Sequence, residues 1–413
     1  MSEIRPFKAL RPKKELAAKV ASPPYDVLNS SEARKMAEGN PISFLHINKP
    51  EIDLPEDTDI HGKAVYEKGA ENLTRFIKDG VFIQDKKACY YIYRQIMGDH
   101  SQIGLVAGAS VEEYKKDLIK KHELTRADKE DDRVAHMTHL NAQVGPVFLT
   151  YKAQPSIDSI VDNIVKRTPE NDFTAHDGIR HTLWIVDEDQ EIKTLTAEFK
   201  KLDALYVADG HHRSASAARF YDKKISEGNH TGNEDYNYFL TVIFPHNQMY
   251  IMDYNRVVKD LNGHTPKALL EKISEKFSIA KSGQSVQKPS QKHHFVMYLD
   301  GDWYTLAAKA GTYNPEDPVD RLDVSILMKN LLMPLLAIGD PRTDKRIDFV
   351  GGIRGLEELK RRVDSGEMAI AFGLFATSIE DLMAIADAGA IMPPKSTWFE
   401  PKLRSGLVIH LLD

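Results

Sequence analysis

The stretch Leu205-Tyr206-Val207-Ala208-Asp209-Gly210-His211-His212-Arg213 is the part of this sequence that decides its fold. Its first four residues are apolar and typical of a strand, and small helix-forming residues follow it from Ser214 to Phe220. The polar turn therefore joins the end of a strand to the start of a helix. Such a junction presents unpaired backbone N–H groups and the positive end of the helix dipole.

The residues of this turn suit the binding of a phosphate group. Gly210 lets the backbone approach a ligand closely or adopt a positive φ. Arg213 can hold phosphate oxygens in a bidentate manner, and His211 and His212 add donors. Asp209 can orient a histidine, ligate Mg²⁺ or accept a hydroxyl proton. The alternative is that Asp209 caps the helix and that both histidines are exposed turn residues. Because neighbours in sequence rarely face one ion together, we expect no metal site made by these two histidines.

The elements around the turn alternate as they do in mixed α/β folds. We expect strands at 147–151, 181–187 and 204–208, and helices at 156–166 and 191–201. A polar, Ser-, Gln- and Lys-rich stretch at 280–293 marks a boundary. The sequence therefore predicts an α/β fold with a mixed sheet, divided into an N-terminal region (1–265) that carries the turn and a C-terminal α/β region (290–413).

Further elements are predicted on both sides of this centre. In the first hundred residues we expect a stiff Pro-rich loop at 22–27, a helix at 30–38 that is capped by Asn29 or Ser30, a strand at 43–47, a helix at 61–80 and a strand at 88–97. In the last third, Asp300-Gly301 predicts a hairpin between strands 294–299 and 303–308. Helices at 320–333, 355–363 and 378–387 and strands at 347–350, 368–374 and 407–412 complete the prediction.

A row of basic residues follows helical spacing within a charged segment that we expect to be one long helix, from about Val111 to Leu140. On such a helix the residues of this row share one face, which begins and ends with a histidine: His122, Arg126, Lys129, Arg133 and His136. Such a stripe can hold a polyphosphate. The alternative is a solvated helix that is stabilised by i,i+4 ion pairs. Glu123, beside the first histidine, is a candidate general base or Mg²⁺ ligand.

The bulk composition excludes several classes of protein. The 413 residues carry a net charge of −6, which gives no global attraction to nucleic acid or to an anionic membrane. The single cysteine excludes an intramolecular disulfide framework and any cysteine-rich zinc or iron–sulfur site. The charged N-terminus does not resemble a signal peptide, and no apolar run is long enough to cross a bilayer. We therefore expect a cytoplasmic protein.

Two weaker patterns lie near the C-terminus. The segment 342–346 and the Gly351-Gly352-Ile353-Arg354-Gly355 turn enclose a short strand, which could form an anion site, although tight packing explains such a turn equally well. The loop 392–402 is dense in proline and aromatic residues. It could line a pocket with Lys395 and Lys402 as charges, or simply cover a sheet edge.

Several motifs resemble those of the bacterial family called "domain of unknown function 1015". They extend over nearly the whole chain: Ser-Pro-Pro-Tyr-Asp-Val (22–27), Ser-Phe-Leu-His (43–46), the Lys-His-Glu to Asp-Arg segment (121–133), Gly-Pro-Val-Phe-Leu (145–149), Ala-Asp-Gly-His-His-Arg (208–213) and Pro-Pro-Lys-Ser-Thr-Trp-Phe-Glu-Pro-Lys (393–402). The resemblance implies membership of a family and leaves its function open.

The turn is also similar to the signature of the ParB/sulfiredoxin-like superfamily, and in particular of its free serine kinases. This resemblance implies a ParB/sulfiredoxin-like core and places Asp209, Gly210, His211, His212 and Arg213 at nucleotide phosphates. It also implies ATP or ADP as cofactor, with Mg²⁺, and L-serine as substrate. The kinases' catalytic glutamate has no assured counterpart in this chain. Glu123 is the first candidate, and Asp26 is the second.

Three functions remain in view. The first is nucleotide-dependent phosphoryl transfer to a small hydroxyl compound, in which positioning and charge neutralisation do most of the catalysis and a carboxylate takes the proton. The second is a ParB-like regulatory protein that binds CTP or ATP and associates with DNA. The acidic balance and the lack of a recognisable helix-turn-helix speak against binding to nucleic acid. The third is a regulatory binder of phosphorylated metabolites.

Overall fold

The computed structural model describes residues 2–412, and within them the chain forms two compact units. Unit 1 runs from the N-terminus to Met249 and resumes at Pro401, whereas unit 2 comprises Tyr250–Glu400. This division differs from the predicted one in two places. The first boundary comes before residue 265, and the last residues of the chain return to unit 1. Composition marks a polar loop, but it does not show which sheet a later segment joins.

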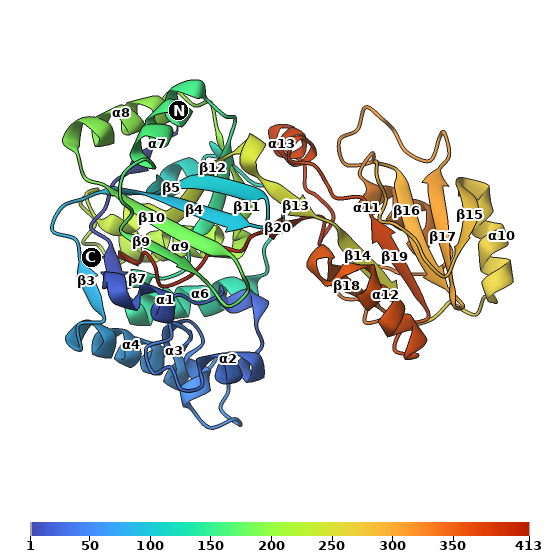
Figure 1. The fold of residues 1–413 in the computed structure, drawn as a ribbon, viewed down its shortest axis with the longest axis horizontal. Coiled ribbons are helices and arrows are strands. Elements are labelled where there is room, and N and C mark those ends of the chain that lie inside the picture. Colours follow the sequence, from blue (N-terminus) through green and yellow to red (C-terminus); the bar gives the residue numbers. More distant parts are fainter. Residues whose placement is uncertain (1, 413) are drawn as a thin grey trace. The chain divides into compact units, whose positions relative to one another are not determined.

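Unit 1 is built on a nine-stranded mixed sheet, whose strands run through the left half of Figure 1. In spatial order the strands are β6 (Ile119–Lys120), β11 (Leu205–Asp209), β8 (Val147–Tyr151), β12 (Tyr238–Pro245), β5 (His100–Ser110), β4 (Tyr90–Met97), β10 (Arg180–Val186) and β9 (Asn171–Thr174), with β1 (Ile4–Arg5) paired to β5. β11 is parallel to β6 and β12 is parallel to β8, and the other pairs are antiparallel. The fold class is therefore mixed α/β, as predicted.

The central strands are apolar on both faces because helices cover the sheet on both sides. All five residues of β8 are buried, as are seven of the eight residues of β12. Such continuous burial is typical of strands that lie inside an α/β layer structure. The main core gathers residues such as Leu149, Val207 and Ile243 with side chains from the covering helices.

Nine α-helices surround this sheet within residues 2–412. They are α1 (Ala17–Val20), α2 (Ser30–Ala37), α3 (Leu45–Asn48), α4 (Lys63–Lys78), α5 (Val111–Lys115), α6 (Ala127–Leu140), α7 (Pro155–Ile164), α8 (Asp189–Phe199) and α9 (His211–Ser226). α9 packs against α6, α4 packs against α6 and α3, and α7 packs against α8. In Figure 1, α7 and α8 lie on one side of the sheet, and α2, α3 and α4 lie together on the other.

Two of the predicted elements in this unit are wrong. The predicted strand 43–47 is a turn followed by α3, in which Leu45 and Ile47 are fully buried. A short apolar run does not distinguish a buried strand from a buried helical turn, and tertiary packing decided between them here.

The predicted cap of α2 is confirmed, because Asn29 and Glu32 form a reciprocal capping box.

The predicted long helix 111–140 is also wrong. α5 ends after five residues, and Asp117 adopts a left-handed conformation with φ 56°. The chain then forms β6, in which Ile119 pairs with Leu205 of β11, and a loop leads on to α6. The helix is interrupted because a fully buried isoleucine is recruited to the edge of the sheet.

Unit 2 contains a six-stranded antiparallel sheet with its own core. In spatial order its strands are β15 (Phe277–Gly283), β17 (Asp302–Ala308), β16 (His294–Leu299), β19 (Ile370–Leu374), β14 (Tyr254–Val258) and β18 (Ile347–Gly351). β13 (Tyr250–Met252) pairs separately with β20 (Trp398–Glu400). The helices are α10 (Pro266–Lys276), α11 (Asp323–Leu327), which continues into a π-helical turn at Met328–Leu332, α12 (Gly355–Asp364) and α13 (Ile379–Asp387). The predicted hairpin at Asp300-Gly301 is confirmed.

The last residues of the chain are tied into unit 1 by backbone pairing. β21 (His410–Leu411) pairs with β7 (Ala142–Gln143), Ile409 exchanges two hydrogen bonds with Leu10, and Ser405 exchanges two with Ser22. β2 (Leu10–Pro12) in turn pairs with β3 (Phe82–Gln84). This returning segment brings Lys402 back to the main sheet.

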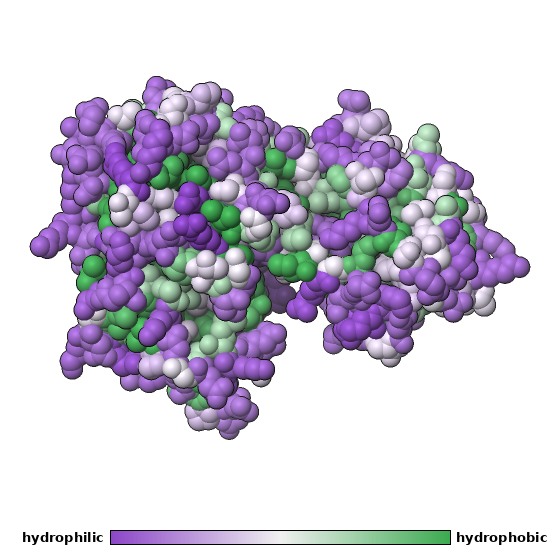
Figure 2. All heavy atoms as spheres, in the orientation of Figure 1, coloured by the Kyte–Doolittle hydropathy of each residue, from purple (hydrophilic) through white to green (hydrophobic). Residues whose placement is uncertain are grey.

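The surface shown in Figure 2 is mostly hydrophilic, and its hydrophobic residues are scattered among polar ones. Within residues 2–412, none of the helices combines the length and the apolar character needed to span a bilayer.

Candidate functional site

The turn between β11 and α9 has the backbone geometry that the sequence predicts. Gly210 is the N-cap residue of α9 and has φ 95° and ψ 30°, a left-handed conformation that glycine adopts at little cost. It brings no capping side chain to the helix, so the first turn of α9 is not capped from within. Its own N–H donates to Oδ1 of Asp209 at 2.8 Å. The strand-to-helix junction is thus an electropositive end of a 16-residue helix.

Asp209 ends β11 and forms an ion pair with Lys402 of the returning segment. The Nζ atom of Lys402 lies 2.9 Å from Oδ2 of Asp209, and the aspartate side chain is 35% exposed. Burial favours the neutral acid, but the charges of Lys402 and Arg213 outweigh it and hold the pKa of Asp209 well below its usual range. Asp209 is therefore a carboxylate at neutral pH. The predicted role as a helix cap does not occur, since Gly210 occupies that position.

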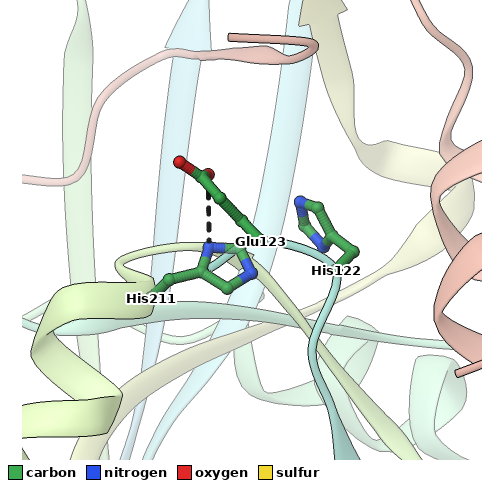
Figure 3. A group of neighbouring side chains, drawn as sticks. All are labelled: His122, Glu123 and His211. Atoms are coloured by element: carbon green, nitrogen blue, oxygen red, sulfur yellow. Dashed lines mark ion pairs between the residues drawn. The ribbon is translucent and has the colours of Figure 1, made fainter. Parts of the chain in front are cut away.

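His211, His122 and Glu123 form a compact group at the start of α9 (Figure 3). The two imidazole rings meet edge to face, with centroids 4.3 Å apart and planes at 87°. Nδ1 of His211 lies 3.7 Å from Oε2 of Glu123, whose side chain is 40% exposed. Burial lowers the pKa of His211 to about 4, and burial beside His211 lowers the pKa of His122 well below its usual value. Both rings are neutral at physiological pH.

His212 is not part of this group and contacts the backbone just before α6. Its Nε2 atom accepts a hydrogen bond from the backbone N–H of Arg126 at 3.1 Å, and the residue is half-buried. Arg126 itself is exposed and pairs with Asp128. The two neighbouring histidines of the turn therefore face different surroundings, one inside the protein and one at its surface.

Arg213 is engaged by the Pro-rich segment of the N-terminus. Its Nη2 atom donates to both carboxylate oxygens of Asp26, and its Nη1 atom donates to the carbonyl of Pro146 at 2.9 Å. The guanidinium carbon also lies 5.4 Å from the centre of the Tyr25 ring. The prediction that Arg213 grips a phosphate therefore requires that Asp26 gives way to the ligand.

The predicted basic stripe does not form one helical face. His122 lies in the loop after β6, and Arg126 is the N-cap residue of α6, so only Lys129, Arg133 and His136 lie on the helix. Arg133 pairs with Asp132 and stacks on Tyr25 at 4.0 Å, and Nε2 of His136 contacts the carbonyl of Ile47 at 3.0 Å. Lys129 is half-buried, whereas His136 is fully buried and serves the core. The prediction of a basic stripe was wrong because β6 interrupts the helix on which the stripe depended.

The interior space beside these arginines is small. Tyr25, Arg133, Gly145 and Arg213 line a cavity of about 40 Å³, together with apolar residues such as Val147. Such a volume holds roughly one water molecule and is too small for a phosphate group. A ligand of the junction must therefore approach from the side of Asp209, Lys402 and Glu123, which are partly exposed.

Lys402 is a residue of this site for which the sequence predicted no specific role. The sequence suggested it only as a charge in a Pro- and aromatic-rich loop, yet the structure pairs it with Asp209. The motif in which it stands was one of those that resemble a family, and this was the available signal. The glycine turn at 351–355 is explained by packing, because a Cβ on Gly352 would lie 2.4 Å from Oδ1 of Asp253.

Comparisons with known proteins concern the fold and the family. Among solved structures, a free serine kinase in complex with AMP aligns with 14% identity and a TM-score of 0.35, covering 68% of this chain and 84% of that one. SbnI with a C-terminal truncation, from Staphylococcus aureus, aligns with 9% identity and a TM-score of 0.37, covering 73% and 86%. A conserved hypothetical protein from Pyrococcus furiosus aligns with 15% identity and a TM-score of 0.33, covering 68% and 87%.

No curated protein gives a significant match to this chain. The model of one protein family, described as "Protein of unknown function (DUF1015)", matches residues 4–325, which include the whole β11–α9 junction and the segment that carries Glu123. The chain therefore belongs to the DUF1015 family.

Proposed function

We propose that this protein binds a nucleotide at the β11–α9 junction and transfers a phosphoryl group from it to a small hydroxyl compound, with free L-serine as the first candidate. One observation carries the proposal. Asp209, ionised and paired with Lys402, stands at the uncapped N-terminus of α9, and the partly exposed Glu123 lies 3.7 Å from His211, the first residue of that helix. Backbone amides, a lysine and carboxylates at one place are the groups that phosphoryl transfer uses.

Each group has a defined task in this proposal. The amides at the start of α9 and the ammonium group of Lys402 attract the phosphates of ATP or ADP. Mg²⁺ that arrives with the nucleotide would neutralise charge on the phosphates. A carboxylate, Glu123 or Asp209, accepts the proton of the attacking hydroxyl group. The hydroxyl oxygen bonds to the terminal phosphorus, and ADP or AMP leaves with the electrons of the broken P–O bond.

The resemblance of the turn to the motif of free serine kinases makes L-serine the first acceptor to test. The protein is incubated with ATP labelled at the γ-phosphate, or ADP labelled at the β-phosphate, together with L-serine and a panel of other amino acids and sugars. Formation of labelled phosphoserine supports the proposal. Binding of the nucleotide without transfer to any acceptor favours the alternative of a ParB-like regulatory protein.

An Asp209→Asn variant tests the assignment of the site in this assay. It keeps the size of the side chain and its hydrogen bond from Gly210, but it removes the charge that Lys402 faces. Transfer should fall by at least about tenfold, since a hydrogen bond between charged groups contributes about 1.5–3 kcal/mol. Equal transfer by the folded variant would contradict the assignment of the site.

A further inference from the structure

The side chains of His122, Glu123 and His211 each offer one ligand atom within 4.8 Å of the others (Figure 3). Two of them are adjacent in the loop after β6, where the backbone bends at Glu123, and the third begins α9. The parallel pairing of β6 with β11 fixes the two segments against each other, since Ile119 lies opposite Leu205. The group therefore depends on a rigid sheet edge and on the first residue of a long helix.

The histidines of this group lack the hydrogen bonds that buried imidazoles normally make. His122 is 2% exposed and His211 is 4% exposed. Both ring nitrogens of His122 and Nε2 of His211 are buried without a hydrogen bond of ordinary geometry, and the backbone of Val207 makes a weaker contact with the His122 ring. A buried polar atom without a partner destabilises the folded state. Such atoms in two touching rings indicate that a further group normally satisfies them.

A metal ion fits this group better than a water molecule does. Neutral imidazole nitrogens bind metals through a lone pair, and two histidines with one carboxylate are a ligand set of catalytic zinc sites and of non-haem iron sites. Mg²⁺ prefers oxygen ligands and keeps several waters, so nitrogen donors select a transition metal instead.

We propose that His122, Glu123 and His211 bind a divalent transition-metal ion such as Zn²⁺, Mn²⁺ or Fe²⁺. Its ligands differ from the adjacent pair His211 and His212 that the sequence argued against, and among them the sequence suggested only Glu123 as a ligand, for Mg²⁺. Ligands bound at 2.0–2.1 Å in a tetrahedron lie roughly 3.3 Å apart, so the side chains close in by rotation when the ion binds. The exposed side of Glu123 leaves a coordination position for water or for a substrate oxygen.

This site does not rest on phosphoryl transfer, because its evidence is the geometry and the missing partners of the two rings. If both proposals hold, Glu123 is a metal ligand and Asp209 remains as the carboxylate that accepts the hydroxyl proton. The metal would then lie beside the uncapped start of α9, where it could polarise an oxygen of the substrate.

The full-length protein is first stripped with a chelator and then titrated with Co²⁺ and with Zn²⁺ in the absence of nucleotide. Cobalt bound by nitrogen and oxygen ligands in a tetrahedral site has visible absorption bands, so the spectrum reports the ligand set directly. We expect one equivalent of Co²⁺ per chain to produce these bands and Zn²⁺ to displace it. A colourless Co²⁺ titration together with no measurable heat on addition of Zn²⁺ would overturn the proposal.

Single variants test each ligand. Glu123→Gln, at a partly exposed position, and His211→Asn should each weaken Zn²⁺ binding by at least about tenfold and change the cobalt spectrum. His176→Ala, at an exposed histidine outside the group, is the matched control and should bind as the wild type does. His122→Ala should also weaken Zn²⁺ binding if the variant folds. If it does not fold, Glu123→Gln alone tests whether this loop supplies a metal ligand. Wild-type affinity in both Glu123→Gln and His211→Asn would overturn the site, whatever the outcome of the phosphoryl-transfer assay.

Discussion

The guanidinium group of Arg213 holds the carboxylate of Asp26, with Nη2 lying 2.8 and 3.0 Å from the two oxygens. This pair joins the Pro-rich segment of the N-terminus to the turn that begins α9. Tyr25, next to the aspartate, stacks against both Arg213 and Arg133. Asp26 was only the second candidate for a catalytic carboxylate. Its position indicates that it holds the side chain of Arg213 in place.

Removal of this arginine tests its part in nucleotide binding. Arg213→Ala should lower the affinity for ATP or ADP by an order of magnitude or more, because a hydrogen bond to a charged group contributes about 1.5–3 kcal/mol. The variant also leaves Asp26 and the carbonyl of Pro146 without their donor. Calorimetric titration should therefore be paired with thermal unfolding. Unchanged affinity in a folded variant would remove Arg213 from the site.

The two histidines of the turn should respond differently to alanine substitution. His212→Ala should change the free energy of unfolding by less than about 1 kcal/mol, as substitutions of partly exposed side chains usually do. His211→Ala removes a ring that is 4% exposed and should cost about 2 kcal/mol through the lost burial. Urea denaturation of the two variants side by side measures the difference. An equal loss for both would mean that His212 also has a structural role.

Deletion of the residues after Glu400 should prevent unit 1 from folding. The deleted segment carries Leu403, Leu407, Ile409 and Leu412, all of which are buried, together with the pairing of β21 with β7. Burial of each such side chain contributes about 1.5–3 kcal/mol, and the sum approaches the whole stability of a typical domain. Circular dichroism of the truncated chain should show a loss of cooperative melting. If the truncated chain keeps the wild-type melting temperature, the segment contributes little to the fold.

Acid should destabilise unit 1 through His136. Burial, with the charge of Arg133, lowers the pKa of His136 to about 3, although Asp132 partly opposes this shift. A histidine in the unfolded chain titrates near pH 6.5. Because the folded pKa is the lower one, this contribution to stability is complete above about pH 6.5 and is lost as the pH falls towards 3.

Denaturation at pH 7.5 and pH 5.5 measures this loss. A single neutral histidine of this kind accounts for about 1.4 kcal/mol between the two values. His136→Gln cannot become charged, so its stability should fall less than that of the wild type over the same range. His176→Gln, at an exposed position, should fall as much as the wild type does. Parallel curves for wild type and His136→Gln would contradict the assignment.

Unit 2 should show the opposite response at one position. Burial raises the pKa of Asp323 to about 7, and its Oδ2 atom has no hydrogen-bond partner. Since the unfolded carboxyl group titrates near pH 3.9, the folded state binds the extra proton, and stability falls as the pH rises from about 4 to about 7. Asp323→Asn should therefore be more stable than the wild type at pH 8. In a Trp184→Phe background the fluorescence of Trp303 and Trp398 follows this unit during denaturation, and Asp300→Asn is the exposed control. A variant no more stable at pH 8 than the wild type would mean that the Asp323 carboxyl is ionised without cost.

The local parts of this fold could be predicted because their signals lie within a few residues. The apolar strand before Asp209, the positive φ of Gly210 and the hairpin at Asp300 follow from residue type and from turn chemistry. The helix expected at 111–140 failed because pairing of Ile119 with a strand 86 residues later overrode a local helical pattern. The strand predicted at 43–47 was wrong because either a helix or a strand can bury so short an apolar run.

By itself the sequence determined that a strand meets a helix at a Gly-His-His-Arg turn, since hydrophobic alternation and glycine conformation act over single residues. Only the tertiary structure decided what surrounds that turn. It turned His211 inward against His122 and Glu123, placed Asp26 on Arg213, and returned Lys402 to Asp209. Contacts between such distant segments depend on how whole elements pack into the sheet, and no short pattern in the chain encodes that packing.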